Sequence, residues 1–207
     1  MAVLDRANRL FRRLPTGVVY TAAMLPVLWL IWQTLNGDLG PDPVKTMERS
    51  LGEWALRFLL ASLAITPLRR AGLNLLRFRR ALGLMAFAYA ALHLTVWIWP
   101  DMGLRWAQIT ADVFKRPYIL LGMGGFLAML PLALTSSNTA IRKMGGRSWT
   151  RLHRLAYAAL AFGSLHMVLQ AKLWGYEVVI YAGLAVLLLA LRLRKPAGRS
   201  RTATAQP

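Results

Sequence analysis

Six apolar segments are separated by short polar stretches along this chain of 207 residues. A helix needs about 20 residues to cross the hydrocarbon core of a bilayer. Segments that cross without closing a barrel must be helical, because lipid offers the backbone no hydrogen-bond partner. The pattern therefore predicts an all-α, polytopic membrane protein, a six-transmembrane-helix bundle with helices at about 17–35, 51–68, 82–99, 117–134, 152–169 and 174–191.

The connections between these segments are short, so neighbouring helices are expected to pack antiparallel in one bundle. We therefore predict a single membrane domain over residues 1–207, with 192–207 as a flexible cytoplasmic tail. The first apolar run resembles a signal peptide, because basic residues precede it. However, Trp29, Trp32 and Gln33 stand where small cleavage-site residues belong, which favours a retained helix.

The composition limits the class of protein. The chain is 57% hydrophobic, has a mean hydropathy of +0.42 and carries a formal net charge of +18. Its basic residues form clusters between apolar runs, which argues against a nucleic-acid-binding surface. Cysteine is absent, which excludes disulfides, thiolate metal sites and cysteine-bound iron–sulfur clusters. Any haem would therefore be non-covalent and held by histidine.

Charge also predicts the orientation in the membrane. With six helices both termini lie on one side, and that side holds 19 of the 26 basic residues but only one acid, Asp5. The other side holds seven of the eight acidic residues. The excess of basic residues on cytoplasmic segments places both termini in the cytoplasm.

All three histidines fall in or at the edge of apolar segments: His93, His153 and His166. An ionisable side chain in a membrane span is costly and marks a functional site by default. Imidazole is also a common axial ligand of haem iron. A histidine that only bonds a neighbouring helix is the alternative, but the concentration of all three on two helices favours haem ligation.

The positions along the helices pair two of these histidines. His93 lies about seven residues before the outer end of its helix, and His166 lies thirteen residues, or about 20 Å, beyond His153. His93 and His166 therefore share a depth that suits one six-coordinate haem. His153 lies nearer the cytoplasm. His153 could ligate a second haem, whose other axial position would be held by methionine or water or would stay open. Alternatively, His153 contacts a haem propionate or a flavin.

Of three further features, the first two have two interpretations each. Arg57 follows Glu53 by four residues near the expected outer end of the second helix, as a snorkelling pair or as a partner of a haem propionate. The inner arginines, Arg79 and Arg154 among them, bind a flavin phosphate or represent ordinary cytoplasmic charge facing anionic membrane lipid. Gly122, Gly124 and Gly125 are expected to permit close helix packing.

Four runs cover most of the chain in a familiar order: 52–70, 79–97, 115–137 and 145–169. The last, in which Trp149, His153 and Tyr157 precede His166, is the most specific. Together the runs resemble the MsrQ family, the haem-binding membrane subunits of the periplasmic protein-methionine-sulfoxide reductase system, within the ferric reductase-like transmembrane superfamily. The first fifteen residues match nothing distinctive.

The resemblance implies a b-type cytochrome of the bacterial cell inner membrane that carries heme b and FMN, with His93, His153 and His166 as haem ligands. It would take electrons from the quinone pool or from a cytoplasmic flavin reductase. It would pass them to a periplasmic molybdenum-containing methionine sulfoxide reductase that repairs oxidised proteins. The chain itself would contain no substrate-reducing centre.

Two other functions compete with this one. In the first, the same electron-transfer bundle serves another acceptor, such as ferric chelates. In the second, the histidines relay protons in a proton-coupled membrane transporter. The acids nearest to a span, Glu53 and Glu177, are both expected at outer ends, which weakens the transporter. For electron transfer, the outer loops at 36–50, 100–116 and 170–174 are expected to dock the acceptor, through Asp101 and Asp112 in particular.

Overall fold

The computed structural model describes residues 2–171 and 173–193, and every regular element within these ranges is helical. The predicted all-α fold is confirmed. Most of the predicted tail, from residue 194 on, lies outside the described residues. In chain order the elements are α1 (Ala2–Arg13), α2 (Gly17–Asn36), α3 (Pro43–Arg70), the 3-10 turn η1 (Leu76–Phe78), α4 (Arg79–Val96), the π-helical turn η2 (Trp97–Asp101), α5 (Trp106–Lys115), α6 (Pro117–Leu134), α7 (Asn138–Met144), α8 (Gly146–Leu152), α9 (Leu155–Gln170) and α10 (Tyr176–Leu193).

The long helices match the six predicted segments. Five stretches are long and apolar enough to cross a membrane: Gly17–Asn36, Pro43–Arg70, Leu76–Asp101, Pro117–Leu134 and Gly146–Gln170. The sixth predicted segment forms α10, a helix of 18 residues. The chain is therefore a multi-pass membrane protein of the expected architecture.

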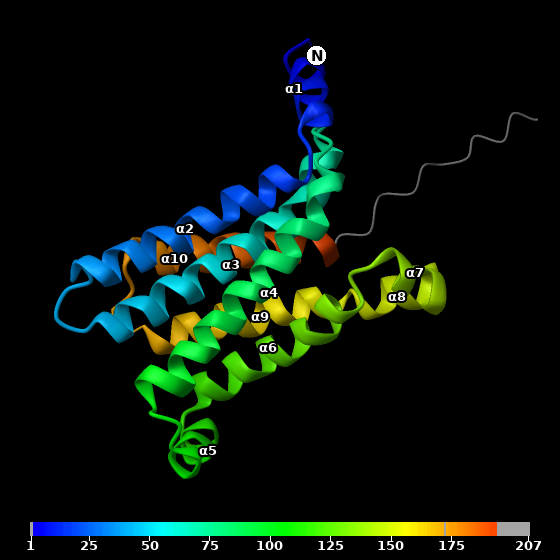
Figure 1. The fold of residues 1–207 in the computed structure, drawn as a ribbon. Helices are drawn as coiled ribbons and strands as arrows, with labels where there is room; N and C mark the ends of the chain where they lie inside the picture. The colour runs from blue at the N-terminus through cyan, green and yellow to red at the C-terminus, as the bar shows by residue number, and fades with distance from the viewer. Residues whose placement is uncertain (1, 172, 194–207) are drawn as a thin grey trace, which may run out of the picture.

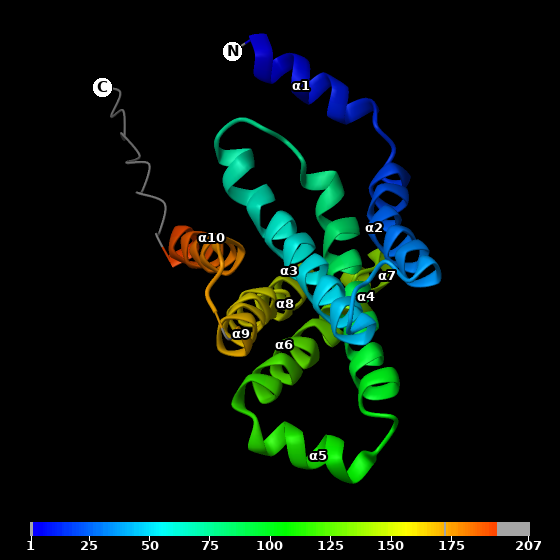
Figure 2. The ribbon, with the colours of Figure 1, turned by 90° about the vertical axis from the view of Figure 1, so that its left-hand side faces the viewer.

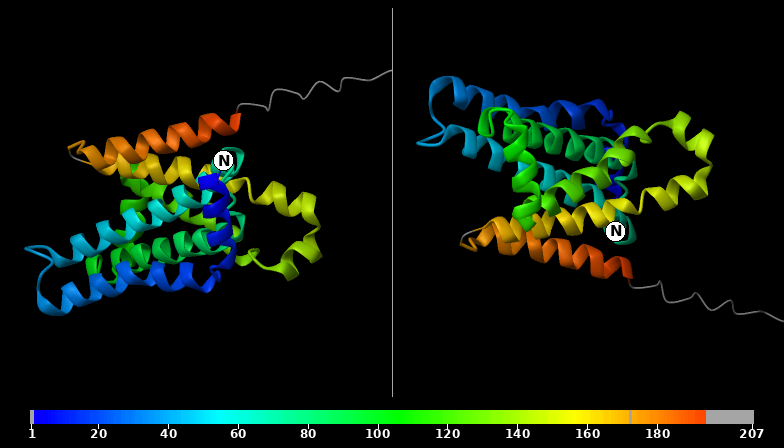
Figure 3. Two further views of the ribbon diagram at one scale, coloured as in Figure 1. Left: turned by 90° about the horizontal axis from the view of Figure 1, so that it is seen from above. Right: turned by 90° about the horizontal axis from the view of Figure 1, so that it is seen from below.

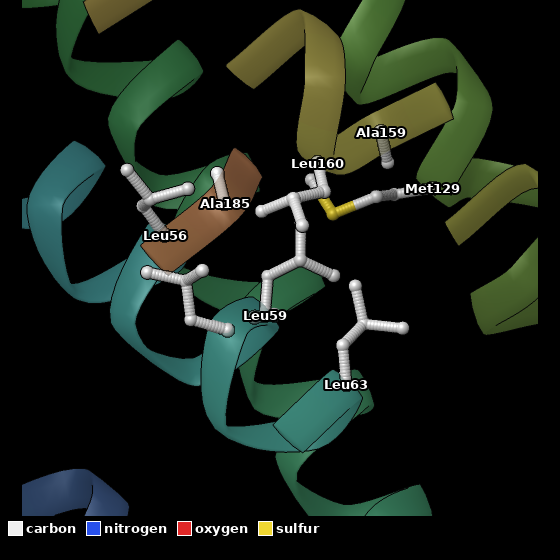
Figure 4. Close-up of a cluster of buried hydrophobic side chains, with 9 residues drawn as sticks. Leu56, Leu59, Leu63, Met129, Ala159, Leu160 and Ala185 are labelled. Carbon is white, nitrogen blue, oxygen red and sulfur yellow. The ribbon is translucent and has the colours of Figure 1, made fainter. Parts of the chain in front are cut away.

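These helices run up and down beside one another (Figure 1). One end of the bundle carries α1, the loop 71–75, α7, α8 and the end of α10, and we call it the basic end. The opposite end, here the acidic end, carries the α2–α3 connection, α5 and the α9–α10 connection (Figure 3). The main core forms where leucines of α3 meet α9 and α10 (Figure 4), and its labelled residues are Leu56, Leu59, Leu63, Met129, Ala159, Leu160 and Ala185.

Helix α3 begins eight residues before the predicted segment, at Pro43 instead of residue 51. The Asp42 side chain accepts a hydrogen bond from the backbone N–H of Lys45 at 3.1 Å and so caps the helix. Proline is well suited to the first helical position, where its missing N–H has no intrahelical partner. Because the first turns are polar, the apolar pattern did not reveal them. As a consequence, Arg57 is the fifteenth residue of a helix of 28 residues.

Tyr89 of α4 joins α2 at its internal proline, Pro26. The Tyr89 hydroxyl donates to the carbonyl of Ala23 at 2.6 Å and accepts from the N–H of Val27 at 3.1 Å. Ala23 and Val27 are an i,i+4 pair, so the hydroxyl takes the place of one helical hydrogen bond. Tyr89 is 1% exposed, and it fixes the position of α2 on α4.

Two amphipathic helices that the apolar pattern did not predict lie across the ends of the bundle. Helix α1 crosses the basic end, and α5 crosses the acidic end where a loop over 100–116 was expected (Figures 2 and 3). The predicted fifth helix also differs. It is divided, because α8 ends at Leu152 and α9 starts at Leu155, with His153 and Arg154 in the turn between them.

Candidate functional site

His93 of α4 and His166 of α9 face each other in the half of the bundle nearer the acidic end. Their ring centroids are 6.1 Å apart and the ring planes meet at 77°. Both side chains are half-buried. The structure therefore brings together the two histidines that the sequence placed at one depth.

Each of these imidazoles is fixed by a backbone carbonyl of a neighbouring helix. Nδ1 of His93 lies 2.8 Å from the carbonyl oxygen of Glu48 on α3, and Nδ1 of His166 lies 2.6 Å from that of Tyr118 on α6. A carbonyl oxygen only accepts, so Nδ1 carries the proton and donates in both pairs. In both rings Nε2 is left with its lone pair available for a metal ion.

A glycine follows each of these carbonyls by four residues: Gly52 after Glu48, and Gly122 after Tyr118. A β-carbon on Gly52 would lie 3.1 Å from Nδ1 of His93, and one on Gly122 would lie 2.9 Å from Nδ1 of His166. In a helix the residue at i+4 stacks over the carbonyl of residue i. Both glycines therefore leave a carbonyl uncovered, so that an imidazole can approach it.

This role of the two glycines could not be seen in the sequence, where Gly122 was expected to serve helix packing and Gly52 had no predicted role. The general packing prediction is confirmed for the neighbouring glycines, because a β-carbon on Gly124 would touch the ring of Phe162 at 3.5 Å, and one on Gly125 would touch the backbone of Gly163 at 3.5 Å. A glycine pattern alone does not say which neighbouring side chain fills the space. That information needs the pairing of α3 with α4 and of α6 with α9.

His153 lies apart from the histidine pair, near the basic end. Its ring stacks on Trp149, with centroids 3.8 Å apart and planes at 26°. Its Nε2 is 3.2 Å from Oγ1 of Thr135, whose hydroxyl donates to the carbonyl of Pro131 at 2.6 Å. The threonine proton is thereby used, so Nε2 of His153 is the donor to Thr135. In this arrangement Nδ1 carries the free lone pair.

Arg57 was predicted near the outer end of its helix, but it lies near the middle, because α3 starts earlier than predicted. Its Nε donates to the hydroxyl of Tyr181 on α10 at 2.6 Å, and its Nη2 donates to Glu53 at 3.0 Å. The guanidinium also lies over the ring of Trp54, at 4.7 Å from the centroid. The snorkelling interpretation is therefore wrong, since the charge is held by protein partners near the middle of the helix.

The arginines at the basic end have fewer contacts. The carbonyl of Arg79 accepts from Ser62 at 3.2 Å, and the side chain of Arg80 donates to Asn138 at 2.8 Å. Arg154 is exposed in the turn before α9. Among the described residues, none of the hydrogen bonds joins Arg79 to Arg154. The structure places both at the same end of the bundle without building a common site from their side chains.

The acids proposed for acceptor docking are not freely accessible. Asp101 receives a hydrogen bond from Nζ of Lys45 at 2.6 Å. Asp112 is buried in α5, and one of its oxygens has no partner among the described residues. The expectation that both carboxylates are accessible to a docking partner is wrong, because η2 and α5 form helical structure where a loop was predicted. Asp38 in the α2–α3 connection is exposed at this end.

Comparison with known proteins gives a consistent result. Residues 51–164 match the family described as ferric reductase like transmembrane component. The chain is also similar to the protein-methionine-sulfoxide reductase heme-binding subunits MsrQ of Brucella anthropi, at 44% identity, and of Brucella ovis and Brucella canis, at 46%. Each comparison extends over 191 residues, which is 92% of this chain and 86% of the relative.

The matched family model starts at the second transmembrane helix and includes two of the three histidines, His93 and His153. His166 lies two residues beyond its end. The chain belongs to the ferric reductase-like transmembrane superfamily and, within it, to the MsrQ family. The family resemblance seen in the sequence is confirmed.

Proposed function

We propose that the protein is a transmembrane electron-transfer subunit in which His93 and His166 are the axial ligands of one heme b. The observation that carries this proposal is the facing pair of imidazoles, each held by a backbone carbonyl at Nδ1 and each with a free Nε2. The relatives are named as haem-binding subunits, which supports the same cofactor here. Bound haem would supply one-electron transfer at its iron.

The spacing of the two rings fits one metal ion between them. Two metal–nitrogen bonds of about 2 Å, with roughly 1 Å from each nitrogen to its ring centre, give centroids about 6 Å apart. The observed separation is 6.1 Å. Donation from Nδ1 to a carbonyl is the usual way in which proteins orient a metal-binding histidine. The residues present therefore fit the cofactor.

Four other side chains also enter the proposal. His153 would ligate a second haem at the basic end through its free Nδ1. Ligation through Nε2 would require the hydrogen bond between Nε2 and Thr135 to break. Arg57 would reach a haem propionate with the N–H groups that Tyr181 and Glu53 do not use. FMN, and the assignment of Arg79 and Arg154 to its phosphate, rest on the family resemblance and on the charge of the basic end.

The family resemblance supports a direction of electron flow. We propose that electrons come from the quinone pool or a cytoplasmic flavin reductase and leave to a periplasmic molybdenum-containing methionine sulfoxide reductase. The relatives' name, a subunit of a protein-methionine-sulfoxide reductase, supports that acceptor. Reconstitution with and without the molybdenum protein separates this function from reduction of another acceptor, such as ferric chelates.

We also propose that the membrane is the bacterial inner membrane and that both termini are cytoplasmic. The uneven distribution of basic residues, 19 of 26 on one side, supports this orientation. A cytoplasmic reporter on the C-terminus should be active and a periplasmic reporter should be inactive. Periplasmic activity would reverse the orientation and move the acceptor side to the basic end.

The cheapest test of the whole proposal is a visible spectrum of the purified protein. A Soret band with the sharp reduced bands of a low-spin, two-histidine haem is expected. If no such band appears after expression with added haem precursor, the protein is not a cytochrome. A proton-coupled transporter with histidine relays would then be the better hypothesis.

A further inference from the structure

A cavity of about 220 Å³ lies at the basic end of the bundle, far along the helices from the facing histidines. It is bounded by α1, the first turns of α2, the end of α3 and the start of α4. Every residue that lines it is apolar, and Phe11, Val19, Ile65, Leu75, Phe78 and Leu82 are among them. The proposed electron-transfer function does not use this cavity.

Helix α1 borders the cavity through Phe11, and specific contacts hold the helix in this position. Asn8 donates to the carbonyl of Gly72 at 2.8 Å and accepts from the N–H of Asn74 at 2.9 Å. Phe11 meets Phe78 edge to face, with centroids 6.5 Å apart. These contacts fix α1 across the ends of the spanning helices, in the plane that a membrane surface would occupy (Figure 3).

Arg77 closes the end of α1. Its Nη1 donates to the carbonyl of Arg12 at 2.5 Å and contacts that of Phe11 at 3.4 Å, which satisfies two carbonyls at the negative end of the helix dipole. This arginine therefore holds α1 in place. The arginines of α1 itself remain available for another partner.

The two faces of α1 have opposite character. Leu4, Ala7 and Phe11 recur at three- and four-residue intervals on the side toward the bundle. The other side carries four exposed arginines, Arg6, Arg9, Arg12 and Arg13. None of the ion pairs among the described residues involves an arginine of α1. Such a helix, basic on one face and apolar on the other, is typical of a membrane interface with anionic lipid.

We infer that the cavity holds the end of an acyl chain of an anionic phospholipid, whose phosphate lies on Arg12 and Arg13 at the mouth. At about 30 Å³ for a group the size of water or methylene, the cavity has room for about seven carbon atoms. Phe11 and Leu14 line the cavity at the C-terminal end of α1, and Arg12 and Arg13 are exposed in the same last turn, so the charge lies within about one helical turn of the apolar space.

The lining distinguishes this occupant from two others. A quinone ring needs hydrogen-bond partners, and none of the lining residues offers a polar side chain. A zwitterionic lipid would bring its own cation beside a helix that has four arginines and one acid, Asp5. Charge complementarity therefore favours a phosphate without a compensating cation.

The experiment places the full-length protein in nanodiscs that contain a photoactivatable lipid with a diazirine near the end of one acyl chain. One preparation uses the phosphatidylglycerol form and the other uses the phosphatidylcholine form. Cross-linked residues are mapped by peptide mass spectrometry. With phosphatidylglycerol, labelling of the segments around Val19, Ile65 and Leu82 is expected to be at least fivefold stronger than with phosphatidylcholine.

Two variants test the cavity and the charge separately. Val19→Trp fills the cavity and should remove most of the labelling, whereas Leu25→Trp, on the 64% exposed Leu25 of the same helix, should not. The double change Arg12→Gln and Arg13→Gln should lower phosphatidylglycerol labelling to the phosphatidylcholine level. Lys143→Gln with Arg147→Gln, which removes the same charge from α7 and α8, should leave labelling unchanged.

A count of retained lipids tests the same inference without a variant. Native mass spectrometry of the wild-type protein should show phosphatidylglycerol retained in preference to phosphatidylcholine. Equal labelling by the two lipids, labelling that survives Val19→Trp in a folded protein, or labelling only by a diazirine-bearing quinone analogue would each overturn the inference.

Discussion

Gly122 on α6 is so close to His166 on α9 that an added β-carbon would lie 2.9 Å from Nδ1 of the imidazole. The ring cannot retreat freely, because the same Nδ1 is bonded to the carbonyl of Tyr118 at 2.6 Å. Gly52 has the same relation to His93, with a β-carbon distance of 3.1 Å. Both proposed ligands are therefore positioned by a glycine one turn after the carbonyl that they bind.

Gly122→Ala should displace the His166 ring, because a separation under 3.0 Å is not tolerated by carbon and nitrogen atoms. The expected result is a loss of most of the low-spin haem spectrum at unchanged protein yield. Gly52→Ala should have the same effect to a smaller degree, since its β-carbon would be only slightly too close to His93. Visible spectra and haem-to-protein ratios measure both effects.

Gly183→Ala is the matched control, because a β-carbon on this glycine of α10 would have no neighbour within 4 Å. It should keep the full haem content. If Gly122→Ala binds haem with an unaltered spectrum, His166 is not held by the Tyr118 carbonyl in the way described, and its role as a ligand loses its main geometric support.

His93→Ala and His166→Ala should each abolish the low-spin spectrum of the same haem, and the double variant should do little more. Each change removes one of two axial ligands of the same iron, so the effects are not additive. Electron paramagnetic resonance of the oxidised protein distinguishes loss of one low-spin signal from loss of two. Two different signals lost in the two single variants would contradict a shared haem.

His153→Ala should leave the haem between His93 and His166 intact. The His153 ring contacts Trp149 and Thr135, and thirteen residues separate it from His166, about 20 Å along a helix. It should instead weaken a second haem at the basic end or slow electron entry there. If His153→Ala and His93→Ala both lose the signal of this haem while His166→Ala keeps it, His93 shares the haem with His153 instead of with His166.

The spanning helices could be read from the sequence because lipid imposes a length and a composition on every crossing segment. The depth of His93 and His166 followed from the same constraint, since both helices start at the basic end. The residues at which the helices begin were harder to predict from the sequence. The polar first turns of α3 depend on the Asp42 cap, and the start of α9 depends on the turn at His153.

The contacts between the glycines and the histidines could not be predicted from the sequence, for a different reason. That Gly52 faces His93 depends on the rotation of α3 against α4, and that rotation is set by packing around residues such as Tyr89 and Leu59. The amphipathic spacing in α1 was present in the first fifteen residues. This spacing alone does not predict a stable helix, because the helix is short and is stabilised by contacts with the loop 71–77 instead of by crossing the membrane.

Tyr89→Phe should destabilise the bundle, because it leaves the carbonyl of Ala23 and the N–H of Val27 without their bridging hydroxyl. An unsatisfied buried polar group costs about 1–3 kcal/mol, so a fall in the thermal unfolding temperature of several degrees is expected. Tyr20→Phe is the control, since Tyr20 is exposed on α2. Equal unfolding temperatures for the two variants would show that α2 is held by other contacts.

Arg57→Gln should lower stability, because it leaves Glu53 and Tyr181 without the guanidinium that connects α3 to α10. Both charged side chains keep some exposure, so a loss of about 0.5–1.5 kcal/mol is expected. The double variant Glu53→Gln with Arg57→Gln should lose less than the sum of the single changes. Thermal unfolding in detergent measures these differences.

The haem midpoint potential tests the second role of Arg57. If its guanidinium also bonds a propionate, Arg57→Gln should lower the potential of the haem, because a nearby positive charge favours the reduced form. Glu53→Gln, which removes a negative charge beside it, should raise the potential. A lower unfolding temperature with an unchanged potential in both variants would restrict Arg57 to joining the two helices.

Asp38→Lys should slow electron transfer to the periplasmic acceptor. Asp38 is exposed at the acidic end, where electrons are proposed to leave, and an opposite charge would repel a partner drawn to that surface. Asp101 and Asp112 are unsuitable for this test, because the first pairs with Lys45 and the second is buried. Asp5→Lys, at the basic end, is the matched control.

Stopped-flow oxidation of the reduced haem at low and high salt should show a several-fold slower rate for Asp38→Lys at low salt only. A rate equal to that of the control at low salt would show that the acceptor docks elsewhere.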